Sequence, residues 1–130
     1  MRVSELSDRT GVSIHRLRRW ESSGLLHAQR DPHGVRRFDE TAVRVVTFVA
    51  MARDLGFGLD HIGRLVPDFA AGRLSIDELV EHLQTRLTEI DTQITDLEDQ
   101  RRRVVDHVAW FDARRPITPT SAAPTPKEPP

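Results

Sequence analysis

The sequence predicts a mainly α-helical protein in which a helical N-terminal head is followed by one long helix. Apolar residues recur at helical spacing between capping residues and glycines, and from Ser75 onward they recur in steps of three and four over about five heptads. We expect a head at residues 1–74, a coiled-coil dimerisation helix at 75–112 and a disordered, Pro-rich tail at 113–130.

Composition limits what the protein is expected to do. The 130 residues suffice for one domain and an appendage, and no apolar run approaches the roughly 20 residues that span a bilayer. The N-terminus lacks the apolar core of a secretory signal, so we expect a cytoplasmic protein with no membrane partner. The chain has no cysteine, which excludes disulfides, thiolate metal sites and iron–sulfur clusters within it.

The net charge of −1 conceals a basic N-terminal end. Residues 1–38 hold eight Arg against four Asp and Glu, a balance of +4, whereas residues 75–115 hold six Arg against ten acids, a balance of −4. Eighteen of the 19 basic residues are Arg; a GC-rich coding sequence is the simpler explanation, and recognition of phosphate and guanine is the functional one. A polyanionic partner is expected at the N-terminal end.

Two short helices are predicted on either side of a turn at Gly11. The first covers about Ser4 to Thr10, and the second begins after Ser13, which can cap it, and ends at Gly24. One side of the second helix is apolar and carries Ile14, Leu17 and Trp20. The rest of its surface is basic and carries His15, Arg16, Arg18 and Arg19. This is the form of a recognition helix in a helix-turn-helix, with Leu25 and Leu26 filling the core beneath it.

A small hairpin, or wing, is predicted next. Asp31-Pro32-His33-Gly34 is a turn sequence with short extended segments on both sides. Its second arm carries Arg36 and Arg37. Paired arginines on a surface hairpin often serve only solubility, but beside a helix-turn-helix we expect them to contact DNA phosphates.

Two further helices should complete the head. Asp39 is the predicted N-cap of a helix from Glu40 to Leu55, ended by Gly56. Its expected core face is formed by Val43, Val46, Val49 and Ala50. A short fourth helix is marked by Leu59, Ile62 and Leu65; Pro67 should end or kink it, which leaves Phe69 and Gly72 in a connection.

The long helix is predicted to start with a capping box, in which Ser75 and Glu78 each accept the other's backbone N–H. Two series of seam positions follow: Val80, Leu87, Ile94, Arg101 and Val108; and Ile76, Leu83, Ile90, Leu97, Val104 and Phe111. So narrow a stripe needs a partner helix, most simply that of a second copy. Arg101 is the polar exception, and it either fixes the register or extends its charge to water.

Three stretches of the sequence resemble the MerR family of bacterial transcription regulators. GVSIHRLRRWESSGLL is similar to the family's G-V-S-x-x-T-L-R-Y-Y-E-x-x-G-L-L, HGVRRFDE to its wing motif G-Y-R-R-Y-x-E, and LGFGLDHI to its L-G-F-S-L-E-E-I. The resemblance covers about residues 2–111. It implies a winged helix-turn-helix head and a homodimer whose long helices pair as an antiparallel coiled coil.

The resemblance also implies a near-palindromic promoter operator that the protein bends and untwists for RNA polymerase. Carried over by position, Arg18, Arg36 and Arg37 would contact the DNA backbone. His15, Arg16 and Arg19 lie on the recognition helix where their side chains could enter the major groove. Ser13, which caps this helix, completes the set of expected DNA-binding residues. Which of Arg16 and Arg19 reads bases stays open. Arg19-Trp20 departs from the family's two aromatics, Val35 replaces a tyrosine and Gly58 a serine cap, which puts the details of phosphate contact in doubt.

A signal is harder to predict. Family members commonly sense a metal, an oxidant or an organic molecule near the end of the long helix, and thiolate sensing is impossible here. Glu78 and His82 lie one helical turn apart, but a solvated pair is the better interpretation, so we expect no metal site and no cofactor. Trp110 and Phe111 could meet Phe57, Ile62 or Phe69 of a partner's head, either as a small-molecule effector site or, more simply, as a head–coil contact.

The favoured function is therefore a homodimeric, sequence-specific transcription regulator and not an enzyme, since no nucleophile–base pair or phosphate-binding loop is present. Its partners would be double-stranded operator DNA, a second copy, and as further candidates RNA polymerase and a small-molecule effector. The alternatives are a coiled-coil adaptor and an architectural DNA-binding protein without an inducer. The residues expected to form the dimer are Val80, Leu83, Leu87, Ile90, Ile94, Leu97, Val104 and Val108.

Overall fold

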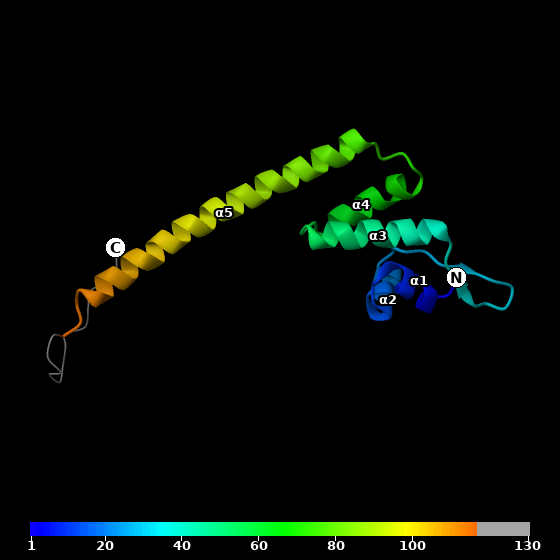
Figure 1. Ribbon diagram of the computed structural model, residues 1–130, viewed down its shortest axis with the longest axis horizontal. Coiled ribbons are helices and arrows are strands. Elements are labelled where there is room, and N and C mark those ends of the chain that lie inside the picture. Colours follow the sequence, from blue (N-terminus) through cyan, green and yellow to red (C-terminus); the bar gives the residue numbers. More distant parts are fainter. Residues whose placement is uncertain (117–130) are drawn as a thin grey trace. The chain divides into compact units, whose positions relative to one another are not determined.

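A computed structural model describes residues 1–116 (Figure 1). Its elements are the helices α1 (Val3–Thr10), α2 (Ile14–Ser22), α3 (Glu40–Asp54), α4 (Leu59–Ala70) and α5 (Ile76–Asp112), and the strands β1 (Gln29–Arg30) and β2 (Arg36–Arg37). The chain divides into two units, Met1–His82 and Leu83–Pro130, so the first turns of α5 belong to unit 1. Of the tail predicted at 113–130, residues 117–130 lie outside the described residues.

Unit 1 is a helical domain with one apolar core. Helix α1 packs against α2 and α3, and α3 packs against α4. The side chains most completely removed from solvent are Leu6, Leu17, Val46, Val49 and Ile62. Leu25 and Leu26 are buried beneath α1 and α2 as predicted, and Leu79 from the second turn of α5 packs on the same core. This core holds the exposed side of α2 in a fixed orientation.

The ends of the first helices follow the predicted signals. The hydroxyl of Ser13 accepts the backbone N–H of Arg16 at 3.2 Å, and the carboxylate of Asp39 accepts that of Ala42 at 3.0 Å. Gly11 and Gly24 take φ values of 73° and 83°, the left-handed conformation that a side chain disfavours. Interactions between neighbouring residues thus define where α2 begins and ends.

The wing is an antiparallel hairpin. Gln29 pairs with Arg37 and Arg30 with Arg36. One carboxylate oxygen of Asp31 accepts the N–H groups of His33 and Val35 at 2.9 and 3.0 Å, so this residue holds the turn together. The predicted hairpin and its turn are confirmed.

The core face of α3 was predicted in the wrong orientation. Val46 and Val49 are buried, but Val43 and Ala50 lie only partly buried at the edge. The buried set is Ala42, Val45, Val46, Phe48, Val49 and Ala52. Because α3 packs between α1 and α4, its buried stripe is broad and rotated by roughly a quarter turn from the predicted one.

Two details of the later helices also differ from prediction. Helix α4 continues through Pro67 to Ala70, so Phe69 is helical rather than part of a connection. Proline removes a single hydrogen bond so close to the helix end, and the cost is correspondingly local. At the start of α5, Glu78 N–H bonds the Ser75 hydroxyl at 3.1 Å, but the Glu78 carboxylate bonds that same hydroxyl rather than the Ser75 N–H.

Helix α5 has 37 residues, which corresponds to about 55 Å at 1.5 Å per residue. Its predicted seam residues are largely exposed in the single chain; Leu97, for example, is 63% exposed, whereas Ile90 is half-buried. The seam includes the exposed residues Val80, Leu83, Leu87, Ile94, Val104 and Val108. None of the helices within residues 1–116 is long and apolar enough to cross a membrane.

Candidate nucleic-acid interface

Helix α2 presents its basic side chains to solvent. Leu17 and Trp20 anchor one side in the core, with Trp20 5% exposed. At 100° per residue, His15 and Ser22 point most directly away from that buried side, with Arg18 and Arg19 to either side of them. Within residues 1–116 the side chains of His15, Arg18 and Arg19 have no hydrogen-bond or ion-pair partner, so this outer face is free to meet a ligand.

Arg16 is placed differently from the other basic residues of α2. Its guanidinium carbon lies 4.9 Å from the centroid of the Trp20 ring, one helical turn further along. A cation over an aromatic face at this distance gains about 0.5–1 kcal/mol at an exposed site. Arg16 is therefore held at the border between the buried side and the outer face of α2.

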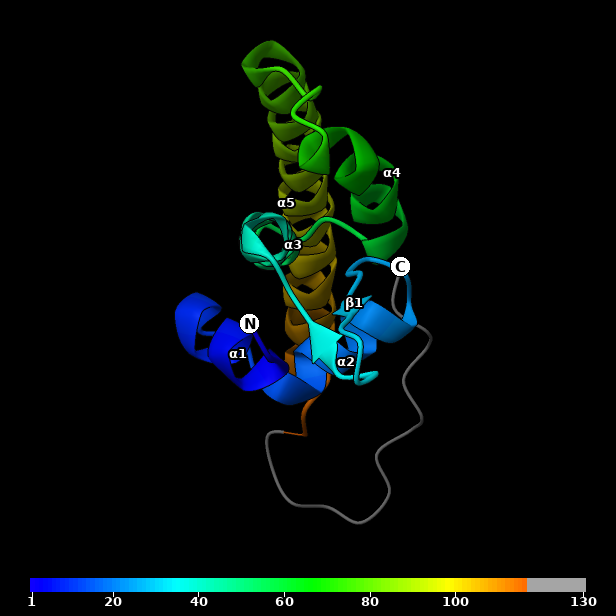
Figure 2. The same cartoon turned by 90° about the vertical axis from the view of Figure 1, so that its right-hand side faces the viewer.

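Helix α2 lies beside the wing (Figure 2), and three arginines from separate segments line a small cleft between them. Arg2, Arg18 and Arg36 line this cavity of about 230 Å³, together with Val3, Glu21 and Val35. We call it the arginine cleft. Glu21 forms an ion pair with Arg36, with 3.2 Å between Oε1 and Nε. Three cations against one carboxylate leave the cleft with a local excess of positive charge, which suits a phosphate group.

Arg2 was missed by the sequence interpretation. It occupies the N-cap position of α1 and makes no capping hydrogen bond with its side chain. A signal was available, because a basic residue directly before a helix cannot cap it and has to extend elsewhere. The fold brings this arginine to the same cleft as Arg18 and Arg36.

Arg37, the second wing arginine, is bound to the wing itself. Its Nε donates to the second carboxylate oxygen of Asp31 at 3.3 Å. The pKa of Asp31 is lowered, chiefly by the N–H of Val35, and further by the N–H of His33 and by Arg37. The guanidinium is thus positioned by a carboxylate that also holds the turn.

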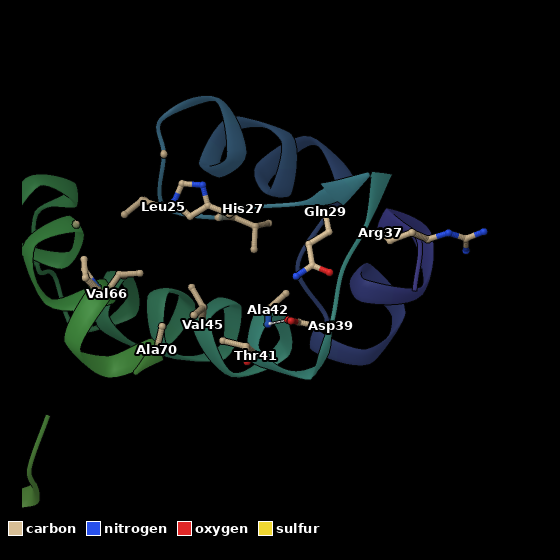
Figure 3. Close-up of a pocket in the computed structure, with 14 residues that line it drawn as sticks. Leu25, His27, Gln29, Arg37, Asp39, Thr41, Ala42, Val45, Val66 and Ala70 are labelled. Atoms are coloured by element: carbon tan, nitrogen blue, oxygen red, sulfur yellow. Dashed lines mark hydrogen bonds between the residues drawn. The ribbon is translucent and has the colours of Figure 1, made fainter. Parts of the chain in front are cut away.

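Unit 1 contains a second, larger cavity that is mainly apolar. It has a volume of about 360 Å³ and lies between the segment after α2, the wing, α3 and α4 (Figure 3). Figure 3 shows Gln29 pointing toward Asp39, while the guanidinium of Arg37 points away from the cavity. None of the residues proposed from the sequence for an effector lines it.

Those residues have other surroundings in the structure. Phe57 and Ile62 are buried in the core, and Phe69 stacks on Phe48 with 4.2 Å between ring centroids. In unit 2, Trp110 packs edge-on against Phe111, with 4.8 Å between the ring centroids. Arg114 lies 3.6 Å from the Trp110 ring centroid. A role of these residues in effector binding or in a head–coil contact stays a prediction.

Glu78 and His82 each have a different partner in the structure. The Glu78 carboxylate bonds Ser75, and the His82 ring faces His61 of α4, with 3.2 Å between Nδ1 and Nε2. Spacing along the sequence did not reveal this histidine pair, since the two residues are 21 positions apart and meet only because α4 and α5 do.

Comparison with known proteins gives a consistent result over most of the chain. Residues 1–68 match the family described as MerR HTH family regulatory protein, and residues 43–106 match the one described as MerR, DNA binding. The HTH-type transcriptional regulator HmrR of Rhizobium leguminosarum bv. viciae is 30% identical over 108 residues, which are 83% of each chain. The regulator CueR of Salmonella typhi is 26% identical over 106 residues, 81% of this chain and 77% of CueR.

Solved structures show the same fold. PbrR691 from Ralstonia metallidurans CH34, in complex with lead(II), has a TM-score of 0.72 at 23% identity, with 85% of this chain and 87% of that one covered. HiNmlR, described as a MerR family regulator lacking the sensor domain and bound to promoter DNA, has a TM-score of 0.57 at 21% identity, with 86% of each chain covered. At these identities the likeness concerns the fold alone.

Proposed function

The chain belongs to the MerR family of DNA-binding transcription regulators, and we propose that it acts as a homodimer on a near-palindromic promoter operator. The observation that carries this proposal is the arginine cleft beside the exposed side of α2. A helix for the major groove and a cluster of cations for the adjacent backbone lie next to each other in one rigid unit.

We assign the cleft to the DNA backbone. Arg2, Arg18 and Arg36 surround a space that fits a phosphate, and Arg37 is held nearby on the wing. Guanidinium groups bind phosphate oxygens in a bidentate manner, which fixes the position of α2 in the groove without reading sequence. Extra contacts of this kind offset the energy needed to bend and untwist the operator.

We assign base recognition to His15 and Arg19. Both lie on the outer face of α2, one helical turn apart, and Arg19 can reach the O6 and N7 atoms of guanine in a bidentate manner. Arg16 is the weaker candidate, because its guanidinium must first leave the Trp20 ring. We therefore propose Arg19 rather than Arg16 as the base contact, and Ser13 supports it by capping the helix.

The dimer is proposed from the apolar seam of α5. Its side chains are 40–63% exposed at Leu83, Leu87 and Leu97, and burial of such a row at about 25 cal/mol per Å² is a strong driving force for pairing. We propose that the head at 1–74 is joined by the helix at 75–112 to a second copy in an antiparallel coiled coil. Arg101 is exposed within the seam, where it either fixes register or extends to water.

Two parts of the function depend on partners other than DNA. We propose that RNA polymerase uses the promoter that this protein has bent. The effector of such a regulator is not a metal bound by thiolates of this chain, because the chain has no cysteine. The alternative is an architectural DNA-binding protein without an inducer. A coiled-coil adaptor is less well supported, because it gives the arginine cleft no role.

The test is selection of bound sequences from a random duplex library, followed by affinity measurements on the selected duplex. We expect Arg19→Ala to lose about 1–3 kcal/mol at one base pair in each half-site and to relax the preference there. Arg36→Ala should instead weaken binding to all duplexes. Arg73→Ala, which removes an arginine paired with Asp68, is the charge-matched control. If no sequence is enriched, the architectural or adaptor function replaces this proposal.

A further inference from the structure

The histidine pair His61–His82 has no role in the proposed DNA contacts. His61 is the third residue of α4, and His82 is the last residue of unit 1, on α5. Both rings are partly buried, and their centroids are 5.1 Å apart with the planes inclined at 64°. Phe57 packs edge-on against His61 at 5.4 Å, so one side of the pair is shielded by an aromatic ring.

The separation of the two ring nitrogens matches that of two ligands on one metal ion. Zinc binds imidazole nitrogen at about 2.0–2.1 Å with tetrahedral angles, which places two ligand nitrogens about 3.3 Å apart and the two ring centroids about 5 Å apart. The structure has 3.2 Å between His61 Nε2 and His82 Nδ1, and 5.1 Å between the centroids. A cation could therefore enter with little movement of either helix.

From this geometry we propose that His61 and His82 form a binding site for a borderline divalent cation, of which Zn²⁺ is the reference case. In the metal-free pair one ring donates N–H to the other; on binding, the donating ring takes its other tautomer, with the proton on the nitrogen that faces away, so both facing nitrogens offer lone pairs to the ion. The two histidines supply two ligands, and water completes the coordination.

The site is expected to be open and reversible. Residues 1–116 contain no group of three or more His, Asp or Glu side chains arranged to hold a metal, so this is not a closed structural site. Acidic residues nevertheless predominate near the pair in the sequence: Asp60 precedes His61, and Glu78 and Glu81 precede His82, against Arg64 and Arg86. The dissociation constant should lie on the order of micromolar, far weaker than a structural zinc site.

Binding would fasten the first turns of α5 to α4. The ion replaces one N–H···N hydrogen bond with two coordinate bonds across the same two helices. Because α4 packs on α3, and α3 begins at the end of the wing, the site is connected to the DNA-binding part through packed helices. This regulatory consequence rests on the proposed function, whereas cation binding itself does not.

The test is calorimetric titration of the full chain with ZnCl₂ in buffer free of chelators. We expect one Zn²⁺ per chain, with His61→Gln and His82→Gln each weakening binding by at least about tenfold, since even loss of an outer-sphere partner costs 10–100-fold. His33→Gln, which removes an exposed histidine from the wing turn, is the matched control and should bind as the unmodified protein does. Equal binding by His61→Gln, or an equal loss in His33→Gln, would overturn the assignment.

A second measurement does not depend on the folding of variants. In the ¹⁵N-labelled protein, ZnCl₂ should shift the imidazole nitrogens of His61 and His82 and leave those of the other four histidines in place. Shifts spread over all six, or none at one equivalent, would reject the site. Affinity for a 30-base-pair duplex, measured with and without Zn²⁺, then tests the regulatory consequence separately: DNA binding without Zn²⁺ uptake rejects only this inference.

Discussion

Replacement of Glu21 by Gln should strengthen DNA binding. The Glu21 carboxylate shares the arginine cleft with Arg2, Arg18 and Arg36 and is paired with Arg36 at 3.2 Å. A phosphate bound in the cleft would lie about 6 Å from this carboxylate. At an effective dielectric constant between about 40 and 80, the repulsion between the two charges is roughly 0.7–1.4 kcal/mol. Glutamine has the same length and removes only the charge.

We therefore expect binding to tighten by about 3–10-fold for one head and by roughly the square of that factor for a dimer with two heads on DNA. The assay is fluorescence anisotropy with a labelled duplex of random sequence, because phosphate contacts do not depend on base sequence. The titration is repeated between 50 and 200 mM salt, where Arg36→Ala should reduce the salt slope by about 1 for each head.

Two controls separate the local effect from the change in net charge. Asp68→Asn removes a carboxylate paired with Arg73 at 3.0 Å, on α4, and should change affinity much less than Glu21→Gln. In an Arg36→Ala background, the gain from Glu21→Gln should become smaller, since the two residues are coupled. Unchanged or weaker binding of Glu21→Gln, in a variant with the same helical content, would refute the assignment of the cleft to phosphate.

Three further predictions concern assembly and stability. Leu97→Asp should convert the proposed dimer to a monomer in light-scattering measurements while leaving helical content in place, because Leu97 is 63% exposed in the single chain. Ser13→Ala should lower the free energy of unfolding by about 0.5–2 kcal/mol in urea titrations, through loss of the N-cap. The pKa values of Asp31 and Glu40 are lowered, by Val35 N–H first for Asp31 and by Arg9 for Glu40. Their stabilisation is therefore complete above the unfolded value near pH 4 and lost as pH falls through the lower folded values. Melting temperature should accordingly fall with acid, less steeply in Glu40→Gln, and an equal fall in both proteins would contradict the Glu40 part.

Local chemistry made much of unit 1 predictable from sequence. The caps at Ser13 and Asp39, the left-handed glycines and the Asp31 turn each depend on a few neighbouring residues, and all were found as expected. The face of α3 was not predicted correctly, because which side is buried depends on how α1 and α4 pack against this helix. Contacts across long sequence separations were missed for the same reason.

The candidate site was likewise predictable only in part from the sequence. The basic residues of α2 and the wing were identifiable from composition and spacing, but their partners were not. That Arg2 joins the cleft, that Arg16 lies on Trp20 and that Arg36 pairs with Glu21 are results of tertiary packing or side-chain placement. These partners are what distinguish Arg19 from Arg16 as the proposed base contact.

The two carboxylates beside the wing arginines do not have equivalent roles. Asp31 accepts two backbone N–H groups besides Arg37, so its removal would open the turn that forms the wing. Glu21 has Arg36 as its one side-chain partner within residues 1–116, so its charge can be removed without loss of fold. The negative charge of Glu21 would repel phosphate and is not needed for the fold, so it should lower affinity for every DNA sequence equally. Because the loss is equal on every sequence, the ratio of operator to nonspecific affinity stays unchanged, while the time spent on both becomes shorter. We therefore expect the charge at Glu21 to adjust the affinity of the head for DNA independently of the base recognition that we propose for His15 and Arg19.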